Sequence, residues 1–278
     1  MPTLSDISAA LAPVVSAMGS DTFPSALSLA LRELVGADDV TLLQYGATSL
    51  PTIAYSAPPG TAIQGTLETY LKGPFLLDPF YRAAANEHRF GVFQLNDLAP
   101  EGFHDSEYYR GWYRNCGFND ECGLLIPLSD GFINLALGVT GSNAQFSPQQ
   151  VRLLEDLFPL VSAIAQHHWR GQRTQQSSQP GLRQQLHCSL AAFGASILTK
   201  RERQITELVL LGNSTRMIAE KLGISTETVK LHRKHAYAKL DVSSQAELFL
   251  LFMEALAHSP NSGNTDPLIA YQSKPGRP

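Results

Sequence analysis

The chain has 278 residues, of which 44% are hydrophobic and 17% are charged, a composition typical of a globular protein with one or two buried cores. It holds no run of about eighteen apolar residues and no basic, apolar N-terminal leader, so we expect a cytoplasmic protein without membrane contact. The formal net charge of −4 argues at first against a nucleic-acid partner.

Residues 1–170 are interpreted as one sensory or regulatory α+β domain. Apolar periodicity predicts helices over 7–18, 24–35, 62–72, 78–86, 105–115 and 148–169, and strands over 39–45, 52–55, 123–128 and 132–139. The last two strands are predicted to form a hairpin, because a Gly-containing turn separates two apolar runs. Antiparallel strands with helices on both sides predict a GAF- or PAS-like α/β/α sandwich.

Aromatic residues are frequent between positions 70 and 118 of this domain, and carboxylates are interleaved with them. Rings in a pocket can bind an apolar or cationic small molecule, and a carboxylate can hold an amine. The alternative is that most of these rings pack in the core, which is the commoner role for any single ring. The candidate effector contacts are Tyr70, Asp78, Phe93, Trp112, Asp120 and Glu121.

Two segments of the chain are interpreted as non-globular. Residues 171–195 contain six glutamines and a Pro-Gly pair, which is typical of an interdomain linker, with some helix expected around 182–190. Residues 259–278 are rich in turn-forming residues and are expected to be a disordered tail. The three cysteines, Cys116, Cys122 and Cys188, have no metal-ligand spacing and are interpreted as buried free thiols.

Charge is distributed unevenly along the chain. Residues 1–171 carry 8 Lys and Arg against 17 Asp and Glu, whereas residues 196–258 carry 9 against 7. An acidic protein with one short basic segment suits contact with DNA through a single helix. The basic residues of that segment are Lys230, Arg233, Lys234 and Lys239.

Capping residues divide the segment 196–258 into short helices. Thr199 and Glu202 have the spacing of a capping box, which predicts a helix that ends near Gly212. Ser214 can cap a second helix, and Ser225 can cap a third after a sharp turn. The turn needs Gly223, because glycine tolerates positive φ.

The third helix has two chemically different sides. Val229, Ala236 and Leu240 are spaced to pack against the preceding helices, which leaves the basic residues and Tyr237 on the other side. A helix of this length fits the major groove of B-DNA, with its N-terminal half at the base edges. Hydroxyls at its start, from Ser225, Thr226 and Thr228, can donate to phosphates together with free backbone amides.

The segments LTKRERQI, MIAEKLGISTETVKLHRKHAYAKL and SSQAEL resemble the LuxR-type helix-turn-helix domain of quorum-sensing and NarL/FixJ-like regulators. The resemblance covers about 60 residues and implies an all-α, four-helix domain that binds double-stranded DNA as a homodimer, with a helix-turn-helix motif from Ser214 to Arg233. It implies that the fourth helix, about 243–257, is the dimerisation helix. By position, it implies base contacts from Lys230, Leu231 and Lys234, and backbone or adjacent contacts from Thr228, His232 and Arg233.

The same resemblance implies a regulatory input domain in the first 170 residues, and RNA polymerase as a further partner. A phospho-receiver is rejected, because no aspartate or lysine follows the predicted strands at the required places. Asp78-Pro79 with Phe93 is similar to the acyl-homoserine-lactone domain, although the upstream Trp and Tyr pattern of that domain is missing. The alternatives left open are a lactone receptor, a receptor for another small molecule and a ligand-independent regulator, with activation favoured by family analogy.

Enzymes are the rival class, and the sequence argues against them. It contains no Gly-rich phosphate loop, nucleophile elbow or zinc triad, so no catalytic residue, cofactor or metal is expected. His167 and His168 end a predicted helix at adjacent positions that point about 100° apart, and both are interpreted as exposed. A protein partner for the basic helix is the remaining alternative, which the salt dependence of binding would separate from DNA.

Overall fold

The computed structural model describes residues 2–46, 50–57, 67, 70–71, 74–111, 113–141, 145–171, 188–258 and 266–272. These residues fall into two compact units that do not follow chain order. The first unit spans 1–64, 79–98 and 117–178, and the second spans 65–78, 99–116 and 179–278. Two segments of the predicted sensory domain therefore belong to the unit of the C-terminal helices, which differs from the single boundary expected in the linker.

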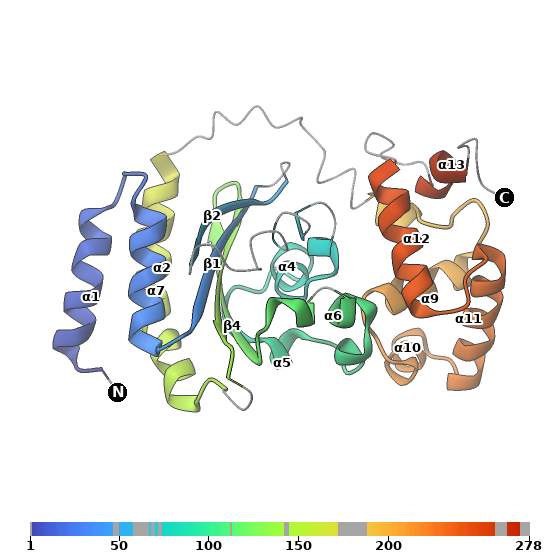
Figure 1. Cartoon of the computed structure of the whole chain (residues 1–278), viewed down its shortest axis with the longest axis horizontal. Helices are drawn as coiled ribbons and strands as arrows, with labels where there is room; N and C mark the ends of the chain where they lie inside the picture. The colour runs from blue at the N-terminus through green and yellow to red at the C-terminus, as the bar shows by residue number, and fades with distance from the viewer. Residues whose placement is uncertain are drawn as a thin grey trace. The chain divides into compact units, whose positions relative to one another are not determined.

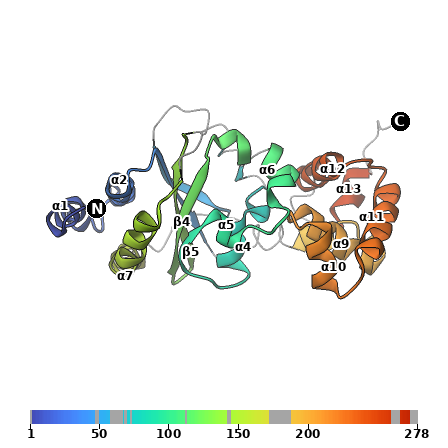
Figure 2. The same ribbon diagram turned by 90° about the horizontal axis from the view of Figure 1, so that it is seen from below.

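Within the described residues, the first unit is built on a five-stranded antiparallel sheet in the order β2-β1-β5-β4-β3. Its strands are β1 (Asp39–Tyr45), β2 (Thr52–Ala57), β3 (Gly91–Gln94), β4 (Asp120–Leu128) and β5 (Gly131–Val139). One face carries α2 (Phe23–Val35) and α7 (Pro148–Gly171), with α1 (Leu4–Ser16) packed on α2, and the other carries the short helices α4 (Pro79–Ala85) and α5 (Leu95–Leu98) (Figure 1). Figure 2 shows these layers from below. The predicted α/β/α sandwich is confirmed.

Alternate strand residues form the main core between the sheet and α1, α2 and α7. Successive side chains of a strand point to opposite faces, so every second residue of β1, β4 and β5 is turned toward these helices. Leu154, Val161 and Ala165 of α7 pack against them at the predicted helical spacing. The strand residues of this core are Val40, Leu42, Ala57, Cys122, Leu124, Ile126, Ile133, Leu135, Leu137 and Val139.

The end of α7 differs from its prediction at one residue. His167 is exposed as expected, but His168 is buried. The His168 ring stacks on Phe23 with centroids 4.1 Å apart, and its Nδ1 accepts a hydrogen bond from the Gly19 amide at 3.0 Å. Burial lowers the pKa of His168 and favours the neutral ring. The expectation that both histidines are exposed is therefore wrong for His168. Its burial comes from contact with the α1–α2 connection, which lies far away in sequence.

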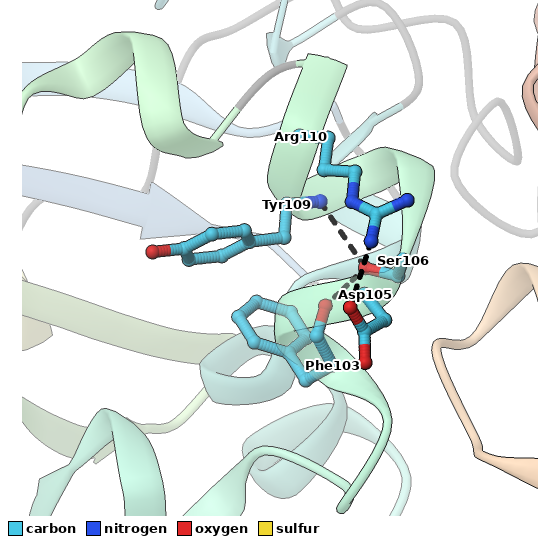
Figure 3. A network of polar contacts seen from close by, with 5 residues as sticks. All are labelled: Phe103, Asp105, Ser106, Tyr109 and Arg110. Atoms are coloured by element: carbon cyan, nitrogen blue, oxygen red, sulfur yellow. Dashed lines mark hydrogen bonds and ion pairs between the residues drawn. The ribbon is translucent and has the colours of Figure 1, made fainter.

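The segment predicted as a helix over 105–115 is helical, but it is not one continuous helix. The chain forms three short pieces, η2 (Phe103–Asp105), α6 (Glu107–Gly111) and η3 (Tyr113–Cys116). The Ser106 hydroxyl donates to the Phe103 carbonyl at 2.5 Å and accepts from the Tyr109 amide at 3.1 Å (Figure 3). It therefore competes with the backbone hydrogen bonds of a continuous helix and caps α6 instead. Of the helix predicted over 62–72, the structure describes only residues 67, 70 and 71.

The second unit contains the predicted C-terminal four-helix module, which is confirmed. Its helices are α9 (Lys200–Leu210), α10 (Thr215–Leu222), α11 (Thr226–Leu240) and α12 (Gln245–His258). The same unit contains η1 (Pro74–Leu77) and the broken segment around α6, which contacts α12.

The expectation of a disordered tail is contradicted at 266–272, where α13 (Pro267–Gln272) packs on α12. The buried Asp266 carboxylate accepts hydrogen bonds from the amides of Gly194 at 3.0 Å and Ser196 at 2.8 Å. Leu268 is 1% exposed. The turn-rich composition concealed a short Asp-Pro start, in which the carboxylate precedes a proline at the first helical position.

The last part of the predicted linker also belongs to this module. Residues 172–187 lie outside the described part of the chain, but residues 188–192 are helical. Phe193 packs edge-on against Phe252 of α12 with ring centroids 5.3 Å apart. The C-terminal module is therefore larger than the predicted 196–258, since residues on both sides of that range pack against it.

Candidate nucleic-acid interface and effector region

The helix-turn-helix is held in shape by its serine caps and one glycine. The Ser214 hydroxyl accepts from the Met217 amide at 3.2 Å, and the Ser225 hydroxyl accepts from the Thr228 amide at 3.0 Å. Gly223 ends α10 with φ of +62°, a conformation that β-carbon sterics disfavour in other residues. The predicted caps and turn are confirmed, and they set the direction in which α11 leaves α10.

The inner side of α11 anchors it to the module. Val229, Ala236 and Leu240 are all buried, as their spacing predicts. They face α9 and α10, both of which contact α11. Burial on one side fixes the rotation of the helix about its axis, so the residues on the opposite side are presented outward.

The predicted DNA contacts lie on the outer side of α11 and at its start. Lys230 is exposed and pairs with Glu227 at 2.8 Å, and the Arg233 guanidinium lies 5.8 Å from the Tyr237 ring centre. Leu231 is 52% exposed, so it lies on the outer side of the helix together with the basic residues. Ser225, Thr226, Lys230, Leu231 and Lys234 are exposed, whereas Thr228, His232 and Arg233 are half-buried.

Lys239, which the sequence placed among the basic residues of this helix, is exposed but pairs with another helix of the module. Its Nζ lies 2.6 Å from Oε2 of the buried Glu202 of α9. Burial of Glu202 would raise the pKa of its carboxyl, but hydrogen bonds from Lys239 and Thr199 outweigh this and lower the pKa to about 2. The pair therefore joins α9 to the last turn of α11 and positions the helix.

A shallow surface hollow connects α10 to the start of α11. Arg216 and Glu220 line it from α10, and Ser225 and Thr226 line it from the cap of α11. Arg216 is exposed and lies 3.3 Å from the Glu220 carboxylate. Sequence reasoning missed Arg216, because only the folded turn brings it beside the two hydroxyl residues.

The candidate effector residues Asp120 and Glu121 point to opposite faces of β4. Asp120 Oδ2 accepts from the Phe146 amide at 2.9 Å and from Gln94 Nε2 at 3.3 Å. Its Oδ1 accepts from the Glu121 amide at 2.9 Å. These contacts fit a structural role for Asp120, which links Phe146, just before α7, to Gln94 of the edge strand β3. Glu121 is also buried, on the face opposite the main core.

That second face of the sheet carries rings packed against glycines. A β-carbon at Gly123 would lie 2.6 Å from the Phe80 ring, and one at Gly138 would lie 2.5 Å from the Phe118 ring. Glycine at these two positions lets the rings approach the backbone directly. Phe93 of β3, which pairs with Gly123, is half-buried, and Arg89 lies 4.8 Å from its ring centre.

Two buried acceptors on this second face were missed by sequence reasoning. Asn134 Oδ1 and Asp39 Oδ1 have no hydrogen-bond partner among the described residues. Burial raises the pKa of Asp39 to about 6, although Arg32 and Thr41 act in the opposite direction. Buried acceptors without hydrogen-bond partners are rare in native proteins, which makes these two atoms candidate contacts for a donor. Their signal in the sequence is weak, because a single polar residue in an apolar strand is common.

The remaining candidates, Tyr70 and Asp78, form a pair in the second unit. The Tyr70 hydroxyl donates to Asp78 Oδ2 at 2.7 Å, and both residues are buried. Trp112 lies outside the described residues. Other rings of the aromatic series pack on each other: Phe103 lies 5.8 Å from Tyr108 and 5.9 Å from Tyr113 between ring centroids. For these three rings the core role holds.

In the part of the chain that the structure describes, no group of three or more His, Cys, Asp or Glu could hold a metal ion. No helix among the described residues is long and apolar enough to cross a membrane. Cys116 and Cys122 are buried free thiols as expected, while Cys188 is only half-buried.

Comparison with known proteins adds independent information. Residues 196–252 match the family described as bacterial regulatory proteins, luxR family. The chain is 37% identical over 190 residues to a protein of Aeromonas salmonicida described as an HTH-type transcriptional regulator in the exeN 3′ region, which covers 66% of this chain and 96% of that protein. It is 46% identical over 59 residues to the transcriptional regulatory protein UhpA of Salmonella typhimurium, which covers 21% of this chain and 30% of UhpA.

Two solved structures are similar to the chain over different shares of its length. The VqsR LBD domain from Pseudomonas aeruginosa has 27% sequence identity and a TM-score of 0.50, and the match covers 58% of this chain and 95% of that domain. Escherichia coli SdiA has 16% identity and a TM-score of 0.43 over 94% of this chain and 99% of its own.

Proposed function

Because the chain belongs to the LuxR family of bacterial regulatory proteins, we propose that it activates transcription in response to a small molecule bound by its N-terminal domain. Membership makes it a DNA-binding transcriptional regulator, in a family of regulators rather than enzymes. We propose further that it acts in the cytoplasm as a homodimer that contacts RNA polymerase at promoters.

The outward side of α11 is the observation that carries the DNA-binding part of the proposal. Lys230, Leu231 and Lys234 are presented outward and would meet base edges in the major groove. Ser225, Thr226 and Thr228 would donate to phosphates at the helix start, with His232 and Arg233 at the neighbouring backbone. Lys230 would leave its ion pair with Glu227 when it contacts DNA.

Selection of bound fragments from the organism's own sheared genomic DNA tests this reading. We expect enrichment of a few promoters that share a two-fold symmetric site with half-sites about 34–36 Å apart, since a dimer places its two reading helices about one turn of DNA apart. The double variant Lys230→Ala with Lys234→Ala should lose the sequence preference. Unchanged selection by that variant would show that the recognition residues are wrongly assigned.

Salt dependence separates DNA from a protein partner for the same helix. The logarithm of the DNA association constant should fall linearly with the logarithm of salt concentration, by about 0.9 for each phosphate neutralised. Lys234→Ala should reduce this slope by about one such step. A slope that stays the same in the variant would remove Lys234 from the contact surface.

The second face of the sheet supports the effector part of the proposal. Asp39 and Asn134 offer buried acceptors there, and Phe93 and Glu121 lie on the same face. An effector that carries hydrogen-bond donors, such as an amine or a hydroxyl, would satisfy these acceptors. The fold likeness to the VqsR LBD domain also supports a ligand-binding role.

Thermal unfolding of the whole protein with panels of small amines, polyols and acyl-homoserine lactones tests the effector proposal. A ligand present at about 100 times its dissociation constant stabilises the native state by about 2.7 kcal/mol, so binding is detectable as a raised Tm. Asn134→Leu should abolish the shift that a donor ligand causes. A shift of equal size in Asn134→Leu would place the ligand elsewhere.

An acyl-homoserine-lactone receptor is the second candidate function. It is favoured by the buried Tyr70–Asp78 hydrogen bond and by Pro79, which follows Asp78 at the start of α4. The same thermal panel distinguishes the two: stabilisation by lactones that is lost in Asp78→Ala and kept in Asn134→Leu would favour the lactone receptor. Lack of stabilisation by every class would favour a ligand-independent regulator.

A further inference from the structure

Two short segments on either side of the family-matched region contact each other directly. Residues 188–195 precede the matched residues 196–252, and α13 follows them. The buried Asp266 carboxylate, at the residue before α13, accepts hydrogen bonds from the Gly194 amide at 3.0 Å and from the Ser196 hydroxyl at 2.6 Å. Gly194 and α13 both lie outside the matched residues, so this connection is an addition of this chain to the matched region.

The tail also packs on α12, the last of the four helices (Figure 1). Tyr271 of α13 is buried, and its hydroxyl donates a hydrogen bond to the Glu254 carboxylate of α12. The Phe193 ring packs on α12 as well. Residues 266–272, which we call the clasp, therefore hold α12 and the segment around Phe193 together.

The segment that the clasp fastens is the first part of the module to follow the linker. Residues 172–187 connect α7 to it, and α9 begins only at Lys200. A displacement of the linker therefore reaches Gly194 and Ser196 before it reaches α9. Because Asp266 binds both of these residues and α13 packs on α12, such a displacement has a direct route to α12.

Helix α12 has a second apolar side, which faces outward. Ala246, Phe249, Leu250 and Met253 follow one another at spacings of three and four residues and therefore share one side of the helix. Ala246 and Leu250 are exposed, with Leu250 at 58%, and the other two are half-buried. The opposite side is buried in the module, where α9 and α13 contact α12.

The charge pattern allows this outer side to face its own copy. None of its four residues is charged, and an isologous interface between two copies has to be complementary to itself. The two carboxylates beside it on the helix, those of Glu247 and Glu254, accept hydrogen bonds inside the module from the Ser243 amide and the Tyr271 hydroxyl. The surface therefore fits a second copy of this chain better than a charged partner.

We propose that the clasp ties the end of the linker to α12 and so keeps the outer side of α12 in position to pair with a second copy of the chain. An intact clasp holds α12 from its inner side. A released clasp lets α12 move independently of the linker and weakens the pairing. This inference rests on the proposed homodimer and adds to it the element that controls pairing.

Cross-linking at Leu250 in the full chain is the sharpest test. In Leu250→Cys, pairing through α12 brings two new thiols near each other, and a short bifunctional maleimide joins them. Adding Asp266→Ala should lower the cross-linking rate at least about fivefold at equal protein concentration. Hydrogen exchange at the Gly194 and Ser196 amides should become faster, because both lose their acceptor. The chain without Leu250→Cys measures the reaction of the half-buried Cys188.

Leu268 and Ile269 provide a matched pair on the same helix. Leu268 is 1% exposed and Ile269 is 46% exposed. Leu268→Ala should slow cross-linking because it loosens α13 on α12, whereas Ile269→Ala should leave the rate unchanged. Exchange at the Ile205 amide of α9 should stay slow in every variant, which shows that the rest of the module remains folded. Asp266→Asn keeps one acceptor oxygen and should give an intermediate rate.

Each outcome decides for or against the clasp. Slower cross-linking in Asp266→Ala and Leu268→Ala, with an unchanged rate in Ile269→Ala, supports it. Equal rates with and without Asp266→Ala overturn it, as does an equal loss in Ile269→Ala or faster exchange at Ile205 in every variant. Absence of cross-linking in Leu250→Cys, while the wild-type chain sediments as a dimer, overturns the inference and leaves the proposed homodimer intact. A wild-type chain that sediments as a monomer with and without duplex DNA rejects the homodimer and the inference with it.

Discussion

At the scale of single residues, two buried ionisable groups hold elements together by contacts that depend on protonation. Glu202 joins the capping box of α9 to Lys239 at the end of α11. His168 joins the end of α7 to the connection between α1 and α2. Each group lies in a different unit, so their effects on stability can be measured separately.

Glu202 should make the C-terminal module sensitive to acid. Its folded pKa is about 2, below the ordinary value of 4.5, so its contribution to stability is present above pH 4.5 and is lost as pH falls toward 2. We expect the free energy of unfolding of wild type to fall over this range more steeply than that of Glu202→Gln. Urea unfolding at several pH values measures both, and parallel curves would contradict the assignment.

His168 should act in a higher pH range and in the first unit. Its folded pKa lies below 6.5, so the unfolded chain binds the proton more readily and stability declines as pH falls from about 6.5 through the folded value. His168→Phe keeps a ring on Phe23 and should flatten this decline. His167→Ala, at the exposed neighbour, should retain it, and a flat profile in both variants would point to another group.

At the scale of elements, local sequence signals predicted those parts of the fold that are determined locally. The caps at Thr199, Ser214 and Ser225 and the turn at Gly223 were predictable because each satisfies backbone groups within four residues. The hairpin and the helix over 148–169 followed from periodicity. The candidate reading residues followed from the same local pattern together with a family resemblance.

Elements that depend on distant partners were not predictable. Strand β3 has four residues and is recognisable only by its pairing with β4. Helix α13 needs α12 and residues 193–196 to be stable, because six residues do not form an isolated helix. Arg216 was missed because only the folded turn brings it beside Ser225 and Thr226. Asp39 and Asn134 were missed because a single polar residue in an apolar strand is a weak signal.

Ile218 of α10 and Leu231 of α11 form a matched pair of sites, because one should affect the stability of the helix-turn-helix and the other its contact with DNA. Ile218 of α10 is 1% exposed, so Ile218→Ala should destabilise the module by about 2–5 kcal/mol. Leu231 is 52% exposed, so Leu231→Ala should change stability by less than about 0.5 kcal/mol while weakening specific DNA binding. Thermal unfolding and DNA titration of both variants check this, and an undiminished affinity in Leu231→Ala would exclude a base contact.

At the scale of the whole molecule, segments that lie far apart in sequence pack together in one structural unit. Asp266 binds the amides of Gly194 and Ser196 from seventy residues away. Residues 65–78 and 99–116 join the unit of the C-terminal helices from the middle of the N-terminal sequence. The chain is therefore folded as two interleaved parts, although its composition suggests a simple order of domain, linker and domain.

The contacts of Asp266 predict that the last residues stabilise the module. Asp266→Ala removes a buried carboxylate that accepts three backbone hydrogen bonds, and should lower the free energy of unfolding by about 1.5–3 kcal/mol or more. Glu220→Ala, at an exposed carboxylate of α10, serves as the comparison. Equal stability of wild type and Asp266→Ala would mean that α13 does not pack on the module in solution.

Interleaving has a consequence for how such regulators can be recombined. A β-carbon at Gly102 would lie 2.6 Å from the Ser214 amide nitrogen, so the backbone at residue 102 directly meets the turn between α9 and α10. A chimera that joins residues 1–170 to the helix-turn-helix domain of another regulator would keep Gly102 but present it with a foreign turn. If that turn carried a side chain where Gly212 lies, its β-carbon would lie 3.3 Å from the Ser106 β-carbon and 3.4 Å from the Phe103 α-carbon, so the segment around Ser106 would have to shift. A chimera that preserves this contact must therefore inherit Gly102 and Gly212, which are 110 positions apart, together.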